Sequence, residues 1–141
     1  MAAPLEILTR IQKVDLLKEA GDAINATSFV AEDLITDQLR RGTRSDGTEL
    51  PDYSRVSVDV YGKDPGPIKL KDTGAFYQGI KVTAAGQVID YTSTDSKTDD
   101  LELRYSTGRG SILKLSEESR AEYFLDLRPE FVDSIRKKLF T

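Results

Sequence analysis

A chain of 141 residues is long enough to bury the hydrophobic core of one domain, and this one contains neither cysteine nor histidine. The chain therefore has no disulfide or thiolate metal site, and it lacks the commonest general base and zinc ligand. Catalysis would have to rely on carboxylates, lysine, tyrosine or serine. The net charge of −4 also argues against a general nucleic-acid-binding protein, which carries a concentrated basic face.

The first residues show no basic stretch followed by an apolar one, as a secretory signal would. No window approaches the roughly 20 consecutive apolar residues of a membrane-spanning helix. We therefore expect a protein made in the cytoplasm, with no membrane partner and no sequence-specific nucleic-acid partner.

The N-terminal segment, residues 1–41, is predicted to be helical. A break is expected between Gly21 and Ser28, with Ser28 as the N-cap of a second helix that ends before Gly42. Apolar residues of the first helix recur at spacings of three and four and form one stripe: Ile7, Ile11, Val14 and Leu17.

Residues 42–116 are predicted to form a small antiparallel sheet connected by loops. Residues 80–82 and 87–91 indicate a hairpin, and residues 92–100, which lack apolar side chains, indicate an exposed loop. Residues 101–105 fit a short helix or a strand. Three valines alternate with polar residues, which is typical of a half-buried strand: Val56, Val58 and Val60.

A terminal helix is predicted over residues 117–140, with Ser116 as its N-cap and a kink or split near Pro129. The predicted fold class is α+β, with N-terminal helices and a C-terminal helix packed on a small antiparallel sheet. No linker or internal repeat is visible, so residues 1–141 are predicted to form a single domain.

The sharpest local signature is a turn that joins Leu70 to Phe76. Asp72 or Thr73 can cap a short helical turn, and Gly74 permits close backbone approach. The Asp-Thr-Gly triplet also occurs in aspartyl proteases, where two copies share a proton between their carboxylates. This chain has one copy with a charged residue before it, so we interpret the segment as a structural turn that packs Leu70 and Phe76 against the terminal helix.

Charged residues gather in two groups of opposite sign, and either surface solvation or contacts between subunits would explain them. The acidic stretch lacks the ligand spacing of a calcium-binding loop, so no metal or other cofactor is predicted. The candidate subunit-contact residues are the basic group, Arg40, Arg41 and Arg44, and the acidic loop, Asp95, Asp99 and Asp100.

Three short motifs occur in an order that resembles a known family. They are an Asp-Gly turn at Asp46-Gly47, a Leu-x-Asp-Thr-Gly-x-Phe core at residues 70–76, and a Tyr, a glycine loop and an Ile-Leu-x-Leu-Ser segment within residues 105–116. Over residues 28–140 the chain resembles the small virion-morphogenesis, tail-completion and head–tail-joining proteins of long-tailed bacteriophages, in the versions carried by phages of Bacteroidetes.

The resemblance implies a virion protein of the neck or tail end that has no catalytic residues. Its copies would form an oligomeric ring in contact with one another and with neighbouring virion proteins such as the portal, the connector or the tail tube. Two other interpretations stay open from the residues alone: a small intracellular adaptor or regulatory domain that binds a host protein, and a carboxylate-dependent enzyme.

Overall fold

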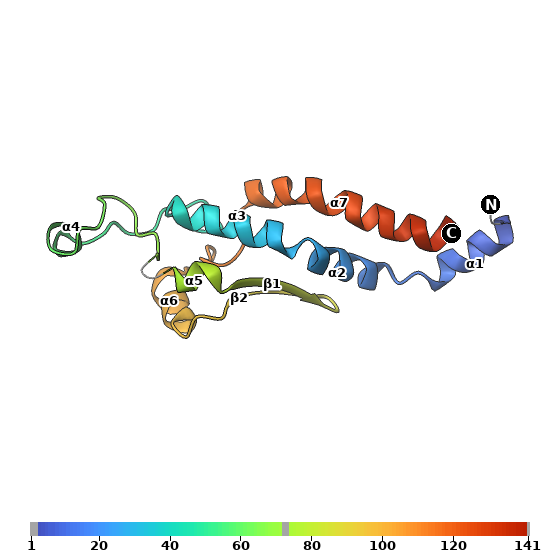
Figure 1. Cartoon of the computed structure of the whole chain (residues 1–141), viewed down its shortest axis with the longest axis horizontal. Coiled ribbons are helices and arrows are strands. Elements are labelled where there is room, and N and C mark those ends of the chain that lie inside the picture. The colour runs from blue at the N-terminus through green and yellow to red at the C-terminus, as the bar shows by residue number, and fades with distance from the viewer. Residues whose placement is uncertain (1–2, 72–73, 141) are drawn as a thin grey trace.

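A line of helices runs along the molecule, with a long C-terminal helix on one side and a β-hairpin on the other (Figure 1). The computed structural model describes residues 3–71 and 74–140. The helices of the line are α1 (Pro4–Lys13), α2 (Leu16–Ala26) and α3 (Ser28–Arg40), and the C-terminal helix is α7 (Glu117–Phe140). The hairpin pairs β1 (Ile80–Ala85) with β2 (Val88–Ser93) in antiparallel register, from Ile80 opposite Ser93 to Ala85 opposite Val88. This arrangement confirms the predicted α+β class.

The breaks in the N-terminal helical line lie where polar side chains bond the backbone. Asp15 accepts a hydrogen bond from the Lys18 amide (3.2 Å) and so caps the start of α2. This cap marks the break between α1 and α2. The second break lies at Thr27, whose hydroxyl donates to the Ala23 carbonyl (2.8 Å). The expected N-cap Ser28 is instead the first residue of α3.

The terminal helix begins as predicted, because the Ser116 hydroxyl accepts a hydrogen bond from the Ser119 amide (3.1 Å). α7 then continues through Pro129 as one helix, so the structure excludes a split at this position. A proline removes one helical hydrogen bond, to the carbonyl four residues earlier. Here that residue is Leu125, which lies on the exposed side of α7 (74% exposed).

The hydrophobic core lies between α3, the inner face of β1 and the segment that leads into α7. Ile35 and Leu39 of α3 are fully buried, and Ile80 and Val82 alternate with exposed residues along β1. This alternation places one face of the hairpin against α3. The other core residues are Ala31, Leu34, Leu50, Phe76, Tyr77, Ile112, Leu113, Leu115 and Tyr123.

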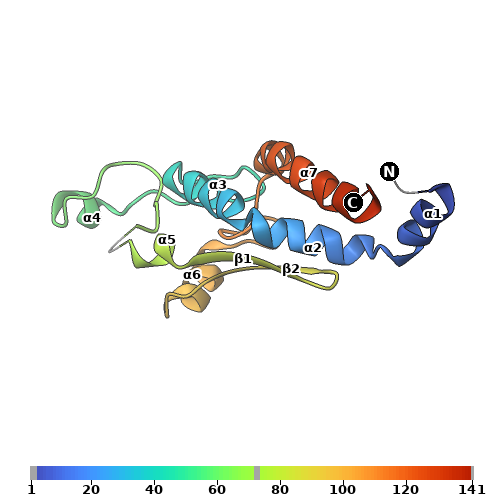
Figure 2. The same cartoon turned by 45° about the vertical axis from the view of Figure 1, so that its right-hand side comes forward.

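The strand predicted around Val56 and Val60 is wrong, because α4 (Arg55–Asp59) occupies this segment. The Ser54 hydroxyl accepts from the Ser57 amide (3.1 Å) and caps the short helix. The segment lies in a loop that projects beyond α3, at the end of the molecule opposite α1 (Figures 1 and 2). A strand needs a neighbour to satisfy its backbone, and no described strand lies beside this loop.

Besides the hairpin and α4, the described part of residues 42–116 contains the helices α5 (Ala75–Gln78) and α6 (Thr98–Tyr105). The exposed loop predicted for residues 92–100 is also partly wrong, because Ser93 and Thr98 are buried. The Ser93 hydroxyl donates to the Phe76 carbonyl (2.9 Å), and the Thr98 hydroxyl donates to the Ser93 carbonyl (3.0 Å). Hydrogen bonds to the backbone make the burial of these polar side chains tolerable.

Candidate assembly surfaces

The basic group divides between internal and surface roles. Arg44 is half-buried and donates hydrogen bonds to the carbonyls of Tyr105 and Glu49, so it joins the turn after α3 to the end of α6. Arg40 forms an exposed ion pair with Asp37 on the same helix, at 3.5 Å. Exposed pairs of this kind contribute about 0–1 kcal/mol.

The acidic loop divides in the same way. The Asp95 carboxylate accepts a hydrogen bond from the Lys97 amide (3.1 Å) just before α6. Asp100 pairs with Arg104 one helical turn further on, at 3.2 Å. Arg41 and Asp99 are both exposed. They are therefore the members of the two groups best placed to meet another molecule.

The predicted turn forms at the start of α5, although Asp72 and Thr73 lie outside the described residues. Gly74 has a φ of 85° and serves as the N-cap of α5, a conformation that favours glycine. Leu70 also has a positive φ, 54°, which is uncommon for a residue with a branched side chain. Phe76 is buried and Leu70 half-buried, but α5 packs against β2 and lies away from α7 (Figure 1). The partner of this turn is therefore the hairpin rather than the terminal helix.

Three tyrosines have perturbed acidity for structural reasons. Burial raises the pKa of Tyr77 to about 12, and its hydroxyl donates to the Lys69 carbonyl. Burial likewise raises the pKa of Tyr123, whose hydroxyl lies 2.7 Å from that of Thr27, and the pKa of Tyr91. The phenols of Tyr77 and Tyr123 thus have partners inside the fold.

An ion pair between a buried carboxylate and a half-exposed lysine joins α2 to the end of α7. Glu19 is 2% exposed, and its carboxylate accepts hydrogen bonds from the Ser134 hydroxyl (2.5 Å) and the Lys138 ammonium group. These two bonds hold the pKa of Glu19 below its ordinary value. Sequence reasoning missed this pair because no local pattern connects residues so far apart in the chain.

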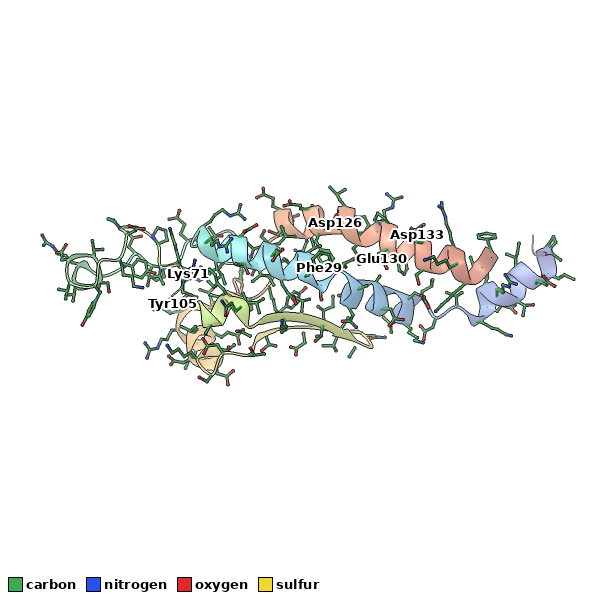
Figure 3. The ribbon with its side chains drawn as sticks, in the orientation of Figure 1. Phe29, Lys71, Tyr105, Asp126, Glu130 and Asp133 are labelled. Atoms are coloured by element: carbon green, nitrogen blue, oxygen red, sulfur yellow. The ribbon has the colours of Figure 1, made fainter. Side chains whose placement is uncertain are left out.

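Among residues 3–71 and 74–140, no three acidic side chains gather closely enough to hold a metal ion. Within the same ranges, no helix combines the length and the apolar composition needed to cross a bilayer. A row of carboxylates does run along one flank of α7, where Asp126, Glu130 and Asp133 are spaced by four and three residues and are all exposed (Figure 3).

Large apolar side chains remain exposed at both ends of the molecule and along its middle. α1 has no buried residue, although its sequence is amphipathic. The exposed apolar residues include Leu5 (78%), Leu8 (51%) and Ile11 (50%) on α1, Val56 (59%), Val60 (69%) and Tyr61 (73%) at the α4 loop, and Phe124 (55%) and Leu125 (74%) on α7.

The solvent-accessible surface area of the chain is also larger than expected for a compact protein. The chain exposes 9453 Å², whereas a compact monomer of 15.7 kDa exposes about 7,300 Å². The excess of about 2,200 Å² exceeds the roughly 1,600 Å² that a standard protein–protein interface buries in total. The chain is therefore more extended than a compact monomer of the same mass.

No protein-family model, curated protein or solved structure matches this chain. Its function is therefore inferred from its sequence motifs and from the surfaces described above.

Proposed function

We propose that this protein is a non-catalytic structural subunit of a phage virion, which joins head connector and tail as part of an oligomeric ring at the neck or tail end. The motifs in residues 28–140 suggest this class, and the observation that carries the proposal is the exposed apolar surface. On α1, Leu5, Leu8 and Ile11 lie on one uncovered helix face, and contiguous exposed apolar surface of this kind marks a site of interaction with other molecules.

The position of this surface favours a ring over a symmetric pair. A ring repeats one heterologous contact, so each subunit needs two different surfaces that complement each other. The apolar face of α1 and the apolar residues of the α4 loop lie at opposite ends of the elongated chain, and those of α7 lie between them (Figures 1 and 2). These surfaces differ in shape and sequence, as the two sides of a heterologous contact must.

The direct test is genetic. In the genome that encodes the chain, a stop codon in place of Gln12 should yield filled heads and separate tails, visible by negative-stain electron microscopy. A plasmid copy of the gene should restore joined particles and infectivity. Joined, infectious virions without this protein would contradict the proposal. A stable complex between the chain and a host protein, with no copy in purified virions, would favour the adaptor interpretation instead.

A further inference from the structure

An apolar groove runs along α7, on the side of the terminal helix that faces α2, and reaches the hairpin at one end. It consists of two adjoining hollows of about 200 Å³ and 380 Å³, which share Phe124 and Leu127. Ala20 and Ile24 of α2 line the two hollows from one side, and Ile89 of β2 lines one of them from the hairpin. The lining of both hollows is mostly apolar.

Some side chains that line this groove are more exposed to solvent than residues of a hydrophobic core. Phe124 is 55% exposed and Ile89 is 42% exposed, although both side chains line the groove. The groove follows α7 from Arg120 to Val132, a helical rise of about 18 Å. A helix of three turns would cover this length.

α1 is a segment of this chain with matching dimensions and chemistry. Its ten residues rise about 15 Å, close to the length of the groove. Leu5, Leu8 and Ile11 form an apolar face at spacings of three, and each is at least half exposed. An amphipathic helix that lays its apolar face into an apolar groove is a common mode of recognition between proteins.

Within one chain, α1 does not lie in the groove. It projects beyond the C-terminal end of α7 in both views (Figures 1 and 2). The Arg10 guanidinium donates to the Leu139 carbonyl (3.0 Å), which holds α1 against the tip of α7. The apolar face of α1 and the groove are therefore both presented to other molecules.

We propose that α1 of one copy docks in the α7 groove of a second copy, and that this contact, repeated head to tail, builds the ring of the proposed function. Each copy would contribute α1 to one neighbour and its groove to the other, so each copy would bury surface in two contacts. The excess surface of about 2,200 Å² is large enough for two such contributions of about 800 Å² each. The ring rests on the proposed function, whereas the docking contact rests on the groove and α1 alone.

Cysteine cross-linking tests the contact directly, because the natural chain contains no cysteine. Leu8→Cys and Phe124→Cys are made in separate full-length chains that carry tags of different size, then mixed and oxidised. The mixed disulfide should form at least about tenfold faster than with Leu103→Cys as the partner of Leu8→Cys, because docking raises the effective concentration. Leu103 is 83% exposed on α6 and lies outside the groove, so it controls for random collision.

Other outcomes of the same experiment would overturn the proposal. Equal rates for the groove and control cysteines would exclude the docking. Faster cross-linking of Tyr61→Cys to Phe124→Cys would assign the groove to the α4 loop. Preferential pairing of Leu8→Cys with itself would indicate a symmetric contact between two α1 helices, and an intramolecular disulfide in a dilute Leu8→Cys/Phe124→Cys chain would show that α1 folds back on its own groove.

A second pair of variants separates docking from folding. Leu8→Glu should abolish the fast cross-link between Ile11→Cys and Phe124→Cys, whereas Thr9→Glu, on the polar side of the same helix, should leave it unchanged. Neither change should alter the far-UV circular dichroism, since α1 has no buried residue. Equal loss in both variants would contradict the proposal. Failure of the docking tests while the stop-codon mutant still separates heads from tails would refute the docking and leave the proposed function standing.

Discussion

Gln38 connects two parts of the fold through its side-chain amide, and replacing it should lower the stability of the protein. The side chain is 1% exposed, its nitrogen donates to the Lys114 carbonyl (2.9 Å) and its oxygen accepts from the Ser116 amide (2.9 Å). Ser116 is also the N-cap of α7. The amide of Gln38 therefore positions the start of the terminal helix against α3.

We predict that Gln38→Met lowers the free energy of unfolding by about 2–4 kcal/mol. Methionine is similar in size and shape, so the change removes two hydrogen bonds without a large cavity. Each backbone group left without a partner costs about 1–3 kcal/mol when buried, and the lower half of this range applies because Ser116 is only half-buried and Lys114 is exposed. With a slope near 2 kcal/mol per molar, the urea midpoint should fall by about 1–2 M.

Urea unfolding followed by far-UV circular dichroism measures this change, with Gln12→Met on exposed α1 as the control, expected within about 0.5 kcal/mol of wild type. A Gln38→Met protein as stable as wild type would refute the reasoning, because it would show that water satisfies both backbone groups. Gln38→Glu adds a second check. Its deficit relative to wild type should narrow as the pH falls, since a protonated carboxyl can again donate to the Lys114 carbonyl.

Three further predictions concern charge and backbone geometry. The interactions that lower the pKa of Glu19 stabilise the fold fully above pH 4.5, and this stabilisation is lost as the pH falls through the folded-state pKa. The stability advantage of wild type over Glu19→Gln should therefore be smaller in urea titrations at pH 3 than at pH 7. Gly42 and Gly47 both have a positive φ, but only a Cβ at Gly42 would clash with a proline ring. Gly47→Ala should lower the free energy of unfolding by about 1–2 kcal/mol, and Gly42→Ala should lower the melting temperature more than Gly47→Ala does. Arg41→Glu should weaken self-association, measured by sedimentation at low salt, by about 0–1 kcal/mol. Adding Asp99→Lys to the same chain should restore part of the lost association. If the second change restores none of it, these two charges face solvent.

The sequence alone determined the features that depend on neighbouring residues. The helical character of the N-terminal segment, the hairpin and the Ser116 cap were predicted correctly, because helical periodicity, strand segments and capping act over a few residues. The predicted stripe from Ile7 to Leu17 missed the break at Asp15, where α1 has already ended. The α+β class follows from these elements and is confirmed. Local rules failed at Val56 and Val60, where alternation indicated a strand but a serine cap and the lack of a neighbouring strand produced α4.

Only the tertiary structure decided which polar groups are buried and which apolar faces are exposed. Glu19 and Gln38 look like solvent-facing residues in the sequence, yet each bonds partners more than 70 positions away. The apolar stripe of α1 fits a core helix equally well, and only the position of α1 beyond the end of α7 shows that it is exposed. Periodicity records that a helix has an apolar face, whereas the packing of distant segments determines whether its own chain or another molecule covers that face.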